Sequence, residues 1–316
     1  MSKDTNTAPE TMSPPARARF GMGWACLYLL VVAVLCYYQA LGPGRTFLPA
    51  DLSLLIPPWS RHAQEMFPDW HGVARPVWDP LFQFYPARKF LASAIQGGFV
   101  PWHDPYLFSG SPFIADGQSA FFYPISWLFA ALPLTSAFGI VAALHTFLAG
   151  LFFTMFTRRR GIGWEGSLIG ATSWMLCGTM VAWQMWQVVD STLCWLPLSL
   201  YFSDRVCRTC DPLGKPNRPT CFLLNFAGLA ASLAMTLVAG HMQFALYSIV
   251  IIIAYMLTVG DRAFKVRVSA AVLAIGLAGM CAAAQILPQM GLLHVSLRGQ
   301  NSASDLLATS MPWTHL

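Results

Sequence analysis

Two aspartates that could do acid–base chemistry, Asp51 and Asp79, lie in a polar, Pro-, Gly- and Trp-rich stretch that separates the first long apolar run from the second. A carboxylate at a membrane surface can take the proton from a hydroxyl group as that group attacks an electrophile. General base catalysis of this kind accelerates a reaction by about 10²–10⁴-fold. Asp79 and Asp51, which lies near the end of the first apolar run, are both candidates for such a base.

Both aspartates also have purely structural interpretations. Asp79 precedes Pro80 at the start of a helix-like run that ends at Gly97-Gly98, and Asp followed by Pro is a typical way to begin a helix. Asp79 could therefore cap that helix and take no part in chemistry, and Asp51 could be an ordinary loop carboxylate. Two further aspartates occupy typical turn sequences, HDPY and ADGQ, and are interpreted as turn residues: Asp104 and Asp116.

Three cations on the predicted outer side are candidates for contacts with an anionic group such as phosphate: Arg88, Lys89 and, mainly through the family resemblance given below, Arg298. Arg binds phosphate through a bidentate fork, whereas Lys acts as a point charge. The alternative for Arg88 and Lys89 is that their long side chains extend to lipid headgroups.

His241 and Gln243 lie in a short polar break between two apolar runs. A polar residue at membrane depth indicates function, but water can reach this break, so solvated side chains explain His241 and Gln243 equally well. Asp190 stands at the start of another apolar run, where capping of a helix is the favoured role. Four tryptophans fit aromatic belts at the membrane interface: Trp127, Trp183, Trp186 and Trp195.

The sequence predicts no metal site. His62, His71 and His103 share the polar stretch with several aspartates, but their spacings match no metal-ligand motif. A divalent cation that assists a bound phosphate is left open. Cys207 and Cys210 form a single C-x-x-C without a second pair, which is a weak zinc or redox signal.

The composition is that of an integral membrane protein. Of the 316 residues, 56% are hydrophobic and 10% are charged, whereas soluble chains carry roughly 25% charge. The mean hydropathy is +0.52. The net charge of +5 does not indicate nucleic-acid binding, because the basic residues sort by membrane side instead.

Seven apolar windows are long enough, some only just, to cross a bilayer core that needs roughly 20 helical residues. We therefore expect an all-α integral membrane protein with about seven transmembrane helices and a long first extracytoplasmic loop that carries interfacial helices. The windows are 22–41, 134–156, 165–184, 189–204, 221–240, 243–259 and 269–289.

The basic residues predict the orientation, because cytoplasmic loops are enriched in Lys and Arg. Five of the six cations assigned to the outer side lie in the long loop, and long loops are translocated largely regardless of charge. The N-terminus is therefore predicted inside and the C-terminus outside. The cations assigned to the cytoplasm are Lys3, Arg17, Arg19, Arg158, Arg159, Arg160, Arg205, Arg208, Lys215, Arg218, Arg262, Lys265 and Arg267.

These features divide the chain into a disordered cytoplasmic N-terminus, residues 1–20, and a single transmembrane domain, residues 21–316, whose first extracytoplasmic loop is 42–120. The prolines of residues 43–78 disfavour long regular elements. Residues 79–98 are expected to form an interfacial helix kinked at Pro86. Residues 119–133 are expected to form a short re-entrant or interfacial helix. The residues after the last window resemble the start of a further segment, so we expect a chain truncated at its C-terminus.

The pattern of residues 49–124 resembles the bacterial YfhO-like membrane proteins, which are grouped with the multi-spanning GT-C glycosyltransferases. Gly240-His241-Met242-Gln243 resembles the Gly-His-x-Gln outer turn of that family, and a later segment is similar at Gln285, Pro288, Ser296 and Arg298. The members we compare are much longer than this chain. The first segment carries the resemblance through Asp51, Pro57, Pro58, Trp59, Asp79, Gln83, Pro86, Gly98, Pro101, Trp102, Asp104, Pro105, Tyr106, Gly110, Pro112, Ala115, Tyr123 and Pro124.

The resemblance implies a glycosyltransferase of the bacterial cytoplasmic membrane. It would move a sugar from a polyprenyl-phosphate-linked donor to a glycan, lipid or protein acceptor on the extracytoplasmic face. The resemblance makes Asp79 the first of the two candidate bases, ahead of Asp51, and Gln83, His241, Gln243 and the cations would bind substrate. Two alternatives stay open: a transporter or flippase of a lipid-linked substrate, and a non-catalytic membrane assembly factor.

Overall fold

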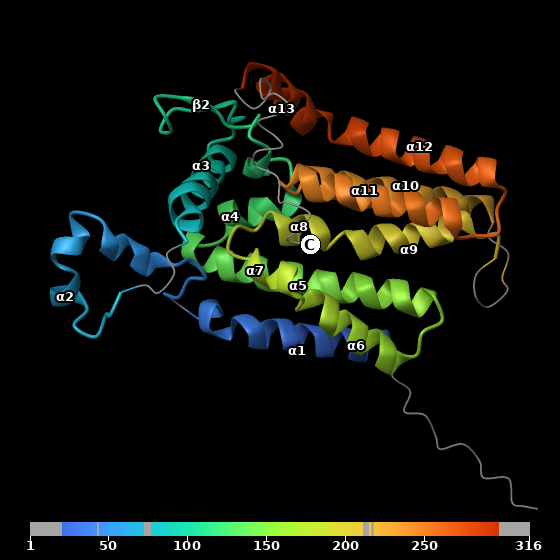
Figure 1. Cartoon of the computed structure of the whole chain (residues 1–316), viewed down its shortest axis with the longest axis horizontal. Coiled ribbons are helices and arrows are strands. Elements are labelled where there is room, and N and C mark those ends of the chain that lie inside the picture. The colour runs from blue at the N-terminus through green and yellow to red at the C-terminus, as the bar shows by residue number, and fades with distance from the viewer. Residues whose placement is uncertain (1–20, 43, 73–76, 211–214, 216–217, 297–316) are drawn as a thin grey trace, which may run out of the picture.

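The computed structural model describes residues 21–42, 44–72, 77–210, 215 and 218–296. Within this part of the chain the structure is mostly helical, and its one sheet is a two-stranded hairpin. Figure 1 shows the long helices side by side along one axis, with α2, α3 and the hairpin gathered at one end. The expected all-α class is confirmed.

Four of the described helices are long and apolar enough to cross a membrane. Each of the four overlaps one of the expected windows, which supports the assignment as a membrane protein. They are α1 (Met22–Leu41), α5 (Leu134–Arg159), α10 (Pro219–Val238) and α12 (Phe264–Cys281).

The other three windows hold shorter helices. Two windows are interrupted: window 165–184 breaks between α6 and α7, and window 189–204 breaks between α8 and α9. Pro197 stands in the first turn of α9, where its missing N–H breaks no helical hydrogen bond. Gln187, in the connection between the two windows, has a left-handed φ of 53°. The third window holds α11, which is apolar but has 17 residues. The bounds are α6 (Trp164–Met175), α7 (Gly178–Ala182), α8 (Val189–Leu193), α9 (Leu196–Cys207) and α11 (Met242–Thr258).

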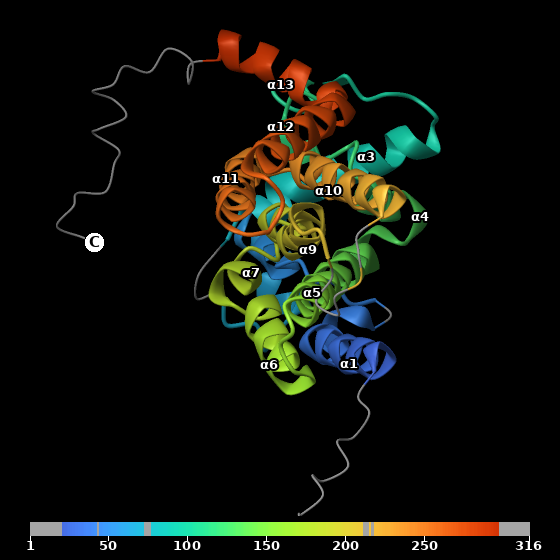
Figure 2. The ribbon, with the colours of Figure 1, turned by 90° about the vertical axis from the view of Figure 1, so that its right-hand side faces the viewer.

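Helix α5 packs against α1, α6 and α9 (Figure 2). Two glycines allow its neighbours to approach closely. A Cβ atom at Gly139 would lie 2.7 Å from the carbonyl oxygen of Ala40, and one at Gly150 would lie 2.8 Å from Met175 Sδ. A second core joins α9, α10, α11 and α12.

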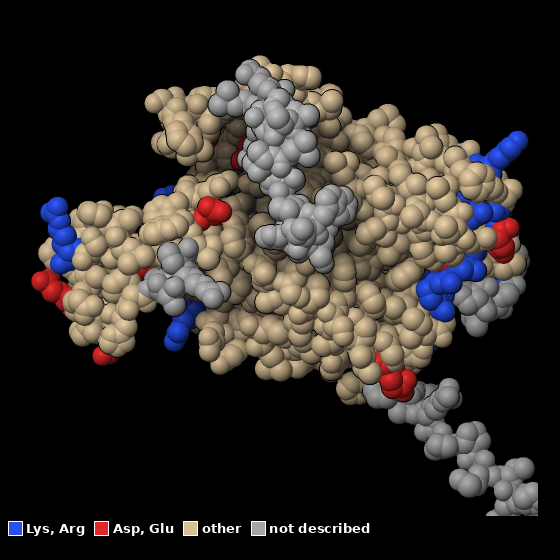
Figure 3. All heavy atoms as spheres, in the orientation of Figure 1, with Lys and Arg blue, Asp and Glu red and all other residues tan. Residues whose placement is uncertain are grey.

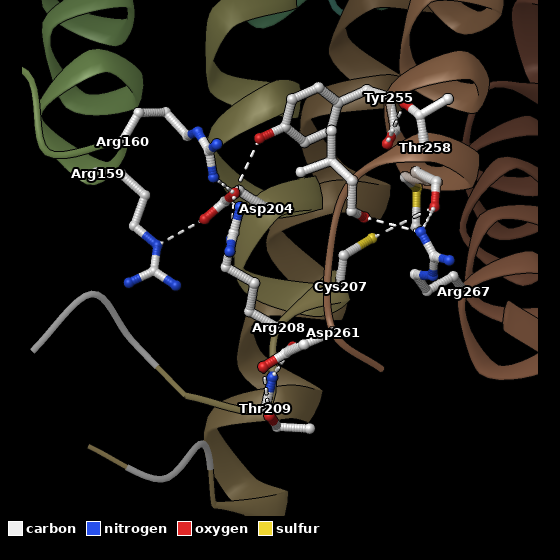
Figure 4. A network of polar contacts seen from close by, with 12 residues as sticks. Arg159, Arg160, Asp204, Cys207, Arg208, Thr209, Tyr255, Thr258, Asp261 and Arg267 are labelled. Atoms are coloured by element: carbon white, nitrogen blue, oxygen red, sulfur yellow. Dashed lines mark hydrogen bonds and ion pairs between the residues drawn. The ribbon is translucent and has the colours of Figure 1, made fainter. Parts of the chain in front are cut away.

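A buried carboxylate ties three helices together at the end of the bundle opposite the hairpin (Figures 1 and 4). Asp204 of α9 accepts hydrogen bonds from Arg159 Nε at 2.9 Å and Arg160 Nη1 at 2.8 Å, both at the end of α5. Arg208 Nε and the hydroxyl of Tyr255 on α11 also donate to it, each at 2.8 Å. Lys and Arg gather at this end of the visible face (Figure 3), which is the end assigned to the cytoplasm from sequence.

The segment between α1 and α5 consists of short helices and the hairpin. A π-helical turn, η3 (Pro80–Phe84), continues into α3 (Tyr85–Gln96), with Pro86 in the first turn of α3. Leu91 and Ala94 of α3 are buried in one cluster with Phe138 of α5. The other elements are η1 (Ala50–Leu55), η2 (Trp59–Arg61), α2 (Ala63–Met66), the antiparallel strands β1 (His103–Asp104) and β2 (Ser111–Pro112), η4 (Gly117–Ser119), η5 (Pro124–Trp127) and α4 (Leu128–Ala131).

Helix α13 (Ala283–Val295) follows α12 and packs over this segment. Gln285 Nε2 donates a hydrogen bond of 2.6 Å to the carbonyl oxygen of Ile114. Gln289 lies so close to Gly117 that a Cβ atom there would be 2.6 Å from Gln289 Nε2. Glycine at position 117 thus allows α13 to contact the segment that precedes α5.

Candidate functional site

A cavity of about 650 Å³ lies where the segment before α5 meets the α7–α8 connection, the turn between α10 and α11, and α13. We call it the Asp79 pocket. Its lining is largely polar and aromatic, and it contains neither Lys nor Arg among the described residues. The lining residues are Asp79, Gln83, Phe84, Asp116, Gly117, Gln118, Trp183, Trp186, Val188, Gly240, His241, Met242, Gln243 and Gln289.

The Asp79 carboxylate is exposed to the pocket and does not cap the helix that follows. Asp79 already has helical backbone angles, φ −54° and ψ −44°, and its side chain makes no capping hydrogen bond. The first helical N–H groups, those of Leu81 and Phe82, donate to the carbonyl of Trp78 instead. The partner of the carboxylate is Trp186, whose Nε1 donates to Asp79 Oδ2 at 3.3 Å. The capping interpretation of Asp79 is therefore wrong.

A second carboxylate, Asp116, lines the same pocket. As the turn sequence predicts, Asp116 Oδ1 accepts a hydrogen bond from the backbone N–H of Gln118 at 3.2 Å. Burial raises the pKa of the Asp116 carboxyl, while the Gln118 N–H and the charge of Arg88 act in the opposite direction. Gln83 Nε2 donates to Gln118 Oε1 at 3.0 Å, which links the two acidic segments across the pocket.

Two indole rings and an imidazole form one wall of the pocket. The ring centroids of Trp183 and Trp186 lie 5.1 Å apart, and that of His241 lies 6.0 Å from Trp183. Burial lowers the pKa of His241, which favours the neutral imidazole, and its Nδ1 has no hydrogen-bond partner. Gln243 Nε2 donates to the hydroxyl of Tyr247 at 2.6 Å. The two tryptophans therefore line a polar cavity, although the sequence suggested an interfacial belt.

Two of the predicted phosphate contacts, Arg88 and Lys89, do not line this pocket. Arg88 is 2% exposed, donates to the backbone carbonyl of Ser119 and lies 5.5 Å from the ring centroid of Phe129. Burial lowers its pKa to about 10. Arg88 thus supports the turn behind the pocket, and the alternative that its side chain extends to lipid headgroups is wrong. Lys89 is exposed but outside the lining, and Arg298 lies outside the described residues.

The structure separates Asp51 from Asp79. Asp51 lines another cavity, of about 710 Å³, together with Met66, Phe67 and Trp70. Asp104 is a turn residue as predicted, because its Oδ1 accepts from the backbone N–H of Tyr106 at 2.9 Å.

No group of three metal-binding side chains occurs in the described part of the chain. His62 pairs with Glu65 at 2.9 Å. Cys207 is buried and Cys210 is half-buried, and neither forms a disulfide in this structure.

A buried polar cluster lies deeper in the bundle, beside α5. Tyr123 OH and His145 Nε2 are 2.8 Å apart, and His145 Nδ1 lies 3.8 Å from Asp190 Oδ2. Trp195 Nε1 donates to the same tyrosine hydroxyl at 3.0 Å. Asp190 is fully buried, and neither of its carboxylate oxygens has a hydrogen-bond partner in the structure. The expectation that Asp190 caps a helix is therefore wrong.

The pocket residues that sequence reasoning did not assign to the site include two indole side chains and three that can pair with a polar ligand: Trp183, Trp186, Asp116, Gln118 and Gln289. Trp183 and Trp186 lie only three residues apart, close to the gap between the windows 165–184 and 189–204. Their closeness could have indicated a shared aromatic surface. The position of Gln289 depends on how α13 folds back, and no local pattern encodes that. Comparisons of the chain with protein-family models, curated proteins and solved structures found no match. The function must therefore be argued from the pocket itself.

Proposed function

We propose that the chain is a membrane glycosyltransferase that moves a sugar from a polyprenyl-phosphate-linked donor to a cell-envelope acceptor, with Asp79 as general base. One observation carries the proposal. Four residues that the sequence analysis singled out line one cavity, although they come from two segments far apart in the chain. They are Asp79, Gln83, His241 and Gln243. That cavity also presents two indole faces and several amides, which suit a polyhydroxylated substrate.

The reaction that this pocket supports is a substitution at the anomeric carbon. An acceptor hydroxyl attacks that carbon while Asp79 takes its proton. The bond between the anomeric carbon and the phosphate oxygen breaks, and the polyprenyl phosphate leaves with the bonding electrons. Lys89, which is exposed outside the lining of the pocket, and Arg298, which lies outside the described residues, stay predicted contacts of this phosphate. Arg88 would act from behind, by holding the turn at Ser119.

The proposed setting is the bacterial cytoplasmic membrane, with the N-terminus inside and the segment 42–120 outside. The proposal includes seven crossings. The four long helices would supply four of them, and the α6–α7 pair, the α8–α9 pair and α11 would supply the others. The concentration of Lys and Arg at the Asp204 end of the bundle (Figure 3) supports this orientation.

A transporter or flippase of a lipid-linked substrate is the second candidate, and one observation favours it. Transporters place polar groups and interrupted helices near the bilayer midplane. His145 is the twelfth residue of the 26-residue α5, and Asp190 beside it belongs to the interrupted stretch α7–α9.

A transfer assay distinguishes the two candidates. Membranes that contain the chain are supplied with labelled polyprenyl-phosphate sugars, and Asp79→Asn is compared with Asp51→Asn, whose carboxylate lies in the other cavity. We expect Asp79→Asn to lower transfer about 10²–10⁴-fold and Asp51→Asn to leave it unchanged. Equal losses in both variants, or equal transfer by Asp79→Asn and the parent, would contradict the role of Asp79. Movement of the lipid-linked sugar across the membrane without transfer would support the transporter.

A further inference from the structure

We infer that the Asp79 pocket selects an uncharged or amino-bearing sugar ring and excludes anionic sugars and the donor phosphate. This inference rests on the proposed function, because it takes the same cavity as the sugar site. It adds the chemical class of the sugar, which the resemblance to glycosyltransferases does not specify.

The aromatic wall suits one face of a sugar ring. The C–H groups of a pyranose carry small positive partial charges, and an indole presents the negative face of its quadrupole. Trp183 is 37% exposed, and Trp186 stands beside it at 5.1 Å. The volume of about 650 Å³ lies within the range of cavities that hold small molecules.

The amides suit the hydroxyl groups of the ring. Gln83, Gln118, Gln243 and Gln289 all line the pocket, and each amide offers both donors and an acceptor. A sugar hydroxyl also donates and accepts, so these side chains can pair with it in either direction. An anion would use the donors alone and leave the acceptor oxygens facing its charge.

The charge of the pocket decides the class of sugar. Asp79 and Asp116 both line it, while no Lys or Arg does so in the described part of the chain. His241 contributes no firm positive charge, because burial lowers its pKa. Arg88 offsets part of the negative charge from behind Ser119, but at 2% exposure it presents no donor to the cavity. A carboxylate or phosphate inside the pocket would therefore meet like charges, and an ammonium group would meet opposite ones.

The test measures binding, separately from transfer. The full chain is purified in a detergent without a sugar headgroup, since such a headgroup would compete for the pocket. Tryptophan fluorescence is followed during titration with methyl glucoside, methyl galactoside, methyl mannoside, glucosamine, glucuronate and glucose 1-phosphate. We expect saturable binding of glucosamine and of at least one methyl glycoside, and at least about tenfold weaker binding of glucuronate and glucose 1-phosphate, a difference of about 1.4 kcal/mol.

Matched variants locate the signal. Trp183→Ala should abolish the fluorescence change, whereas Trp164→Ala, at a tryptophan that stacks on Arg158 far from the pocket, should keep it. If Trp183→Ala does not fold, Trp183→Phe keeps a smaller ring and should weaken binding without abolishing it. The double variant Asp79→Asn/Asp116→Asn should bring glucuronate binding to within about threefold of the best methyl glycoside.

Two results would overturn the inference: glucuronate or glucose 1-phosphate binding to the parent chain as tightly as the uncharged sugars, or no saturable binding of any sugar in the panel. Selective binding of uncharged sugars without any transfer in membranes would refute the transferase and leave the sugar pocket standing. Transfer that works only with an anionic sugar donor would support the transferase and refute the selectivity inferred here.

Discussion

The indole Nε1 of Trp186 donates a hydrogen bond of 3.3 Å to Oδ2 of Asp79, which lies 107 residues earlier in the chain. This contact joins the segment before α5 to the connection between α7 and α8. It also holds one oxygen of the carboxylate against the aromatic wall. In the proposed mechanism the other oxygen is available to accept the proton of an acceptor hydroxyl.

The Trp186–Asp79 hydrogen bond can be removed with little change in shape. Trp186→Phe keeps an aromatic ring but lacks the N–H donor. We expect sugar transfer to fall about 2- to 13-fold, as loss of one hydrogen bond of roughly 0.5–1.5 kcal/mol predicts. The measurement is the transfer rate in membranes at matched protein levels. A rate equal to that of the parent would show that Asp79 needs no positioning by Trp186.

Arg88 should matter for stability, because its guanidinium is buried and donates to the carbonyl of Ser119. Arg88→Met removes this donor and leaves the carbonyl unpaired, so we expect a loss of about 1–3 kcal/mol in the free energy of unfolding. The neighbouring exposed Lys89 gives a matched control, and Lys89→Met should stay within about 0.5 kcal/mol of the parent. Chemical unfolding in detergent measures both variants, and equal stabilities would contradict the structural role of Arg88.

Gly117 and Gln289 should show a coupled effect. A Cβ atom at Gly117 would lie 2.6 Å from Gln289 Nε2, so Gly117→Ala is expected to displace α13 and to lower the melting temperature. Gln289→Ala makes room for that methyl group. The double variant Gly117→Ala/Gln289→Ala should therefore lose less stability than the sum of the two single changes. Strictly additive losses would show that α13 does not contact Gly117.

We expect the titration of Asp116 to make the folding stability of the protein depend on pH. Burial raises the pKa of its carboxyl above the ordinary 3.8, so the native state binds this proton more tightly than the unfolded chain. The contribution of Asp116 to stability is present at low pH and is lost as the pH rises from about 4 through the raised pKa. Relative to the parent, Asp116→Asn should gain stability across that window and stay level above it. Melting temperatures measured in a pH series test this, and a constant difference at all pH values would contradict it.

The sequence was informative where chemistry and chain position coincide. Asp79, His241 and Gln243 were selected from residue type and position and Gln83 through the family resemblance, and all four line one pocket. The sequence was less informative about which side chains are buried. Arg88 and Lys89 are adjacent in the sequence, yet one is buried and the other exposed, because only one of two neighbouring positions on a helix faces the core. Asp190 resembled a cap because interruptions of a buried helix carry the same residue types as exposed helix ends.

The long helices were predictable because a continuous apolar run of about 20 residues has few other uses. The interrupted windows were harder to interpret. Residues 165–184 and 189–204 are apolar enough for spans, but they break into α6, α7, α8 and α9 where the chain packs around α5. The course of α13 depends on the contact of Gln285 with Ile114, 171 residues away. Such contacts are set by tertiary packing and leave no trace in a local window.

The proposed function requires the Asp79 pocket to open to the outside of the cell. Gln118→Cys places a thiol in the pocket lining, and Lys265→Cys places one at the opposite end of the bundle. Intact cells are treated with a membrane-impermeant maleimide, with the parent chain and its eight cysteines as background. We predict that Gln118→Cys is labelled in intact cells and Lys265→Cys only after permeabilisation. Labelling of Lys265→Cys in intact cells, with Gln118→Cys protected until the cells are opened, would place the Asp79 pocket on the cytoplasmic side and contradict the account.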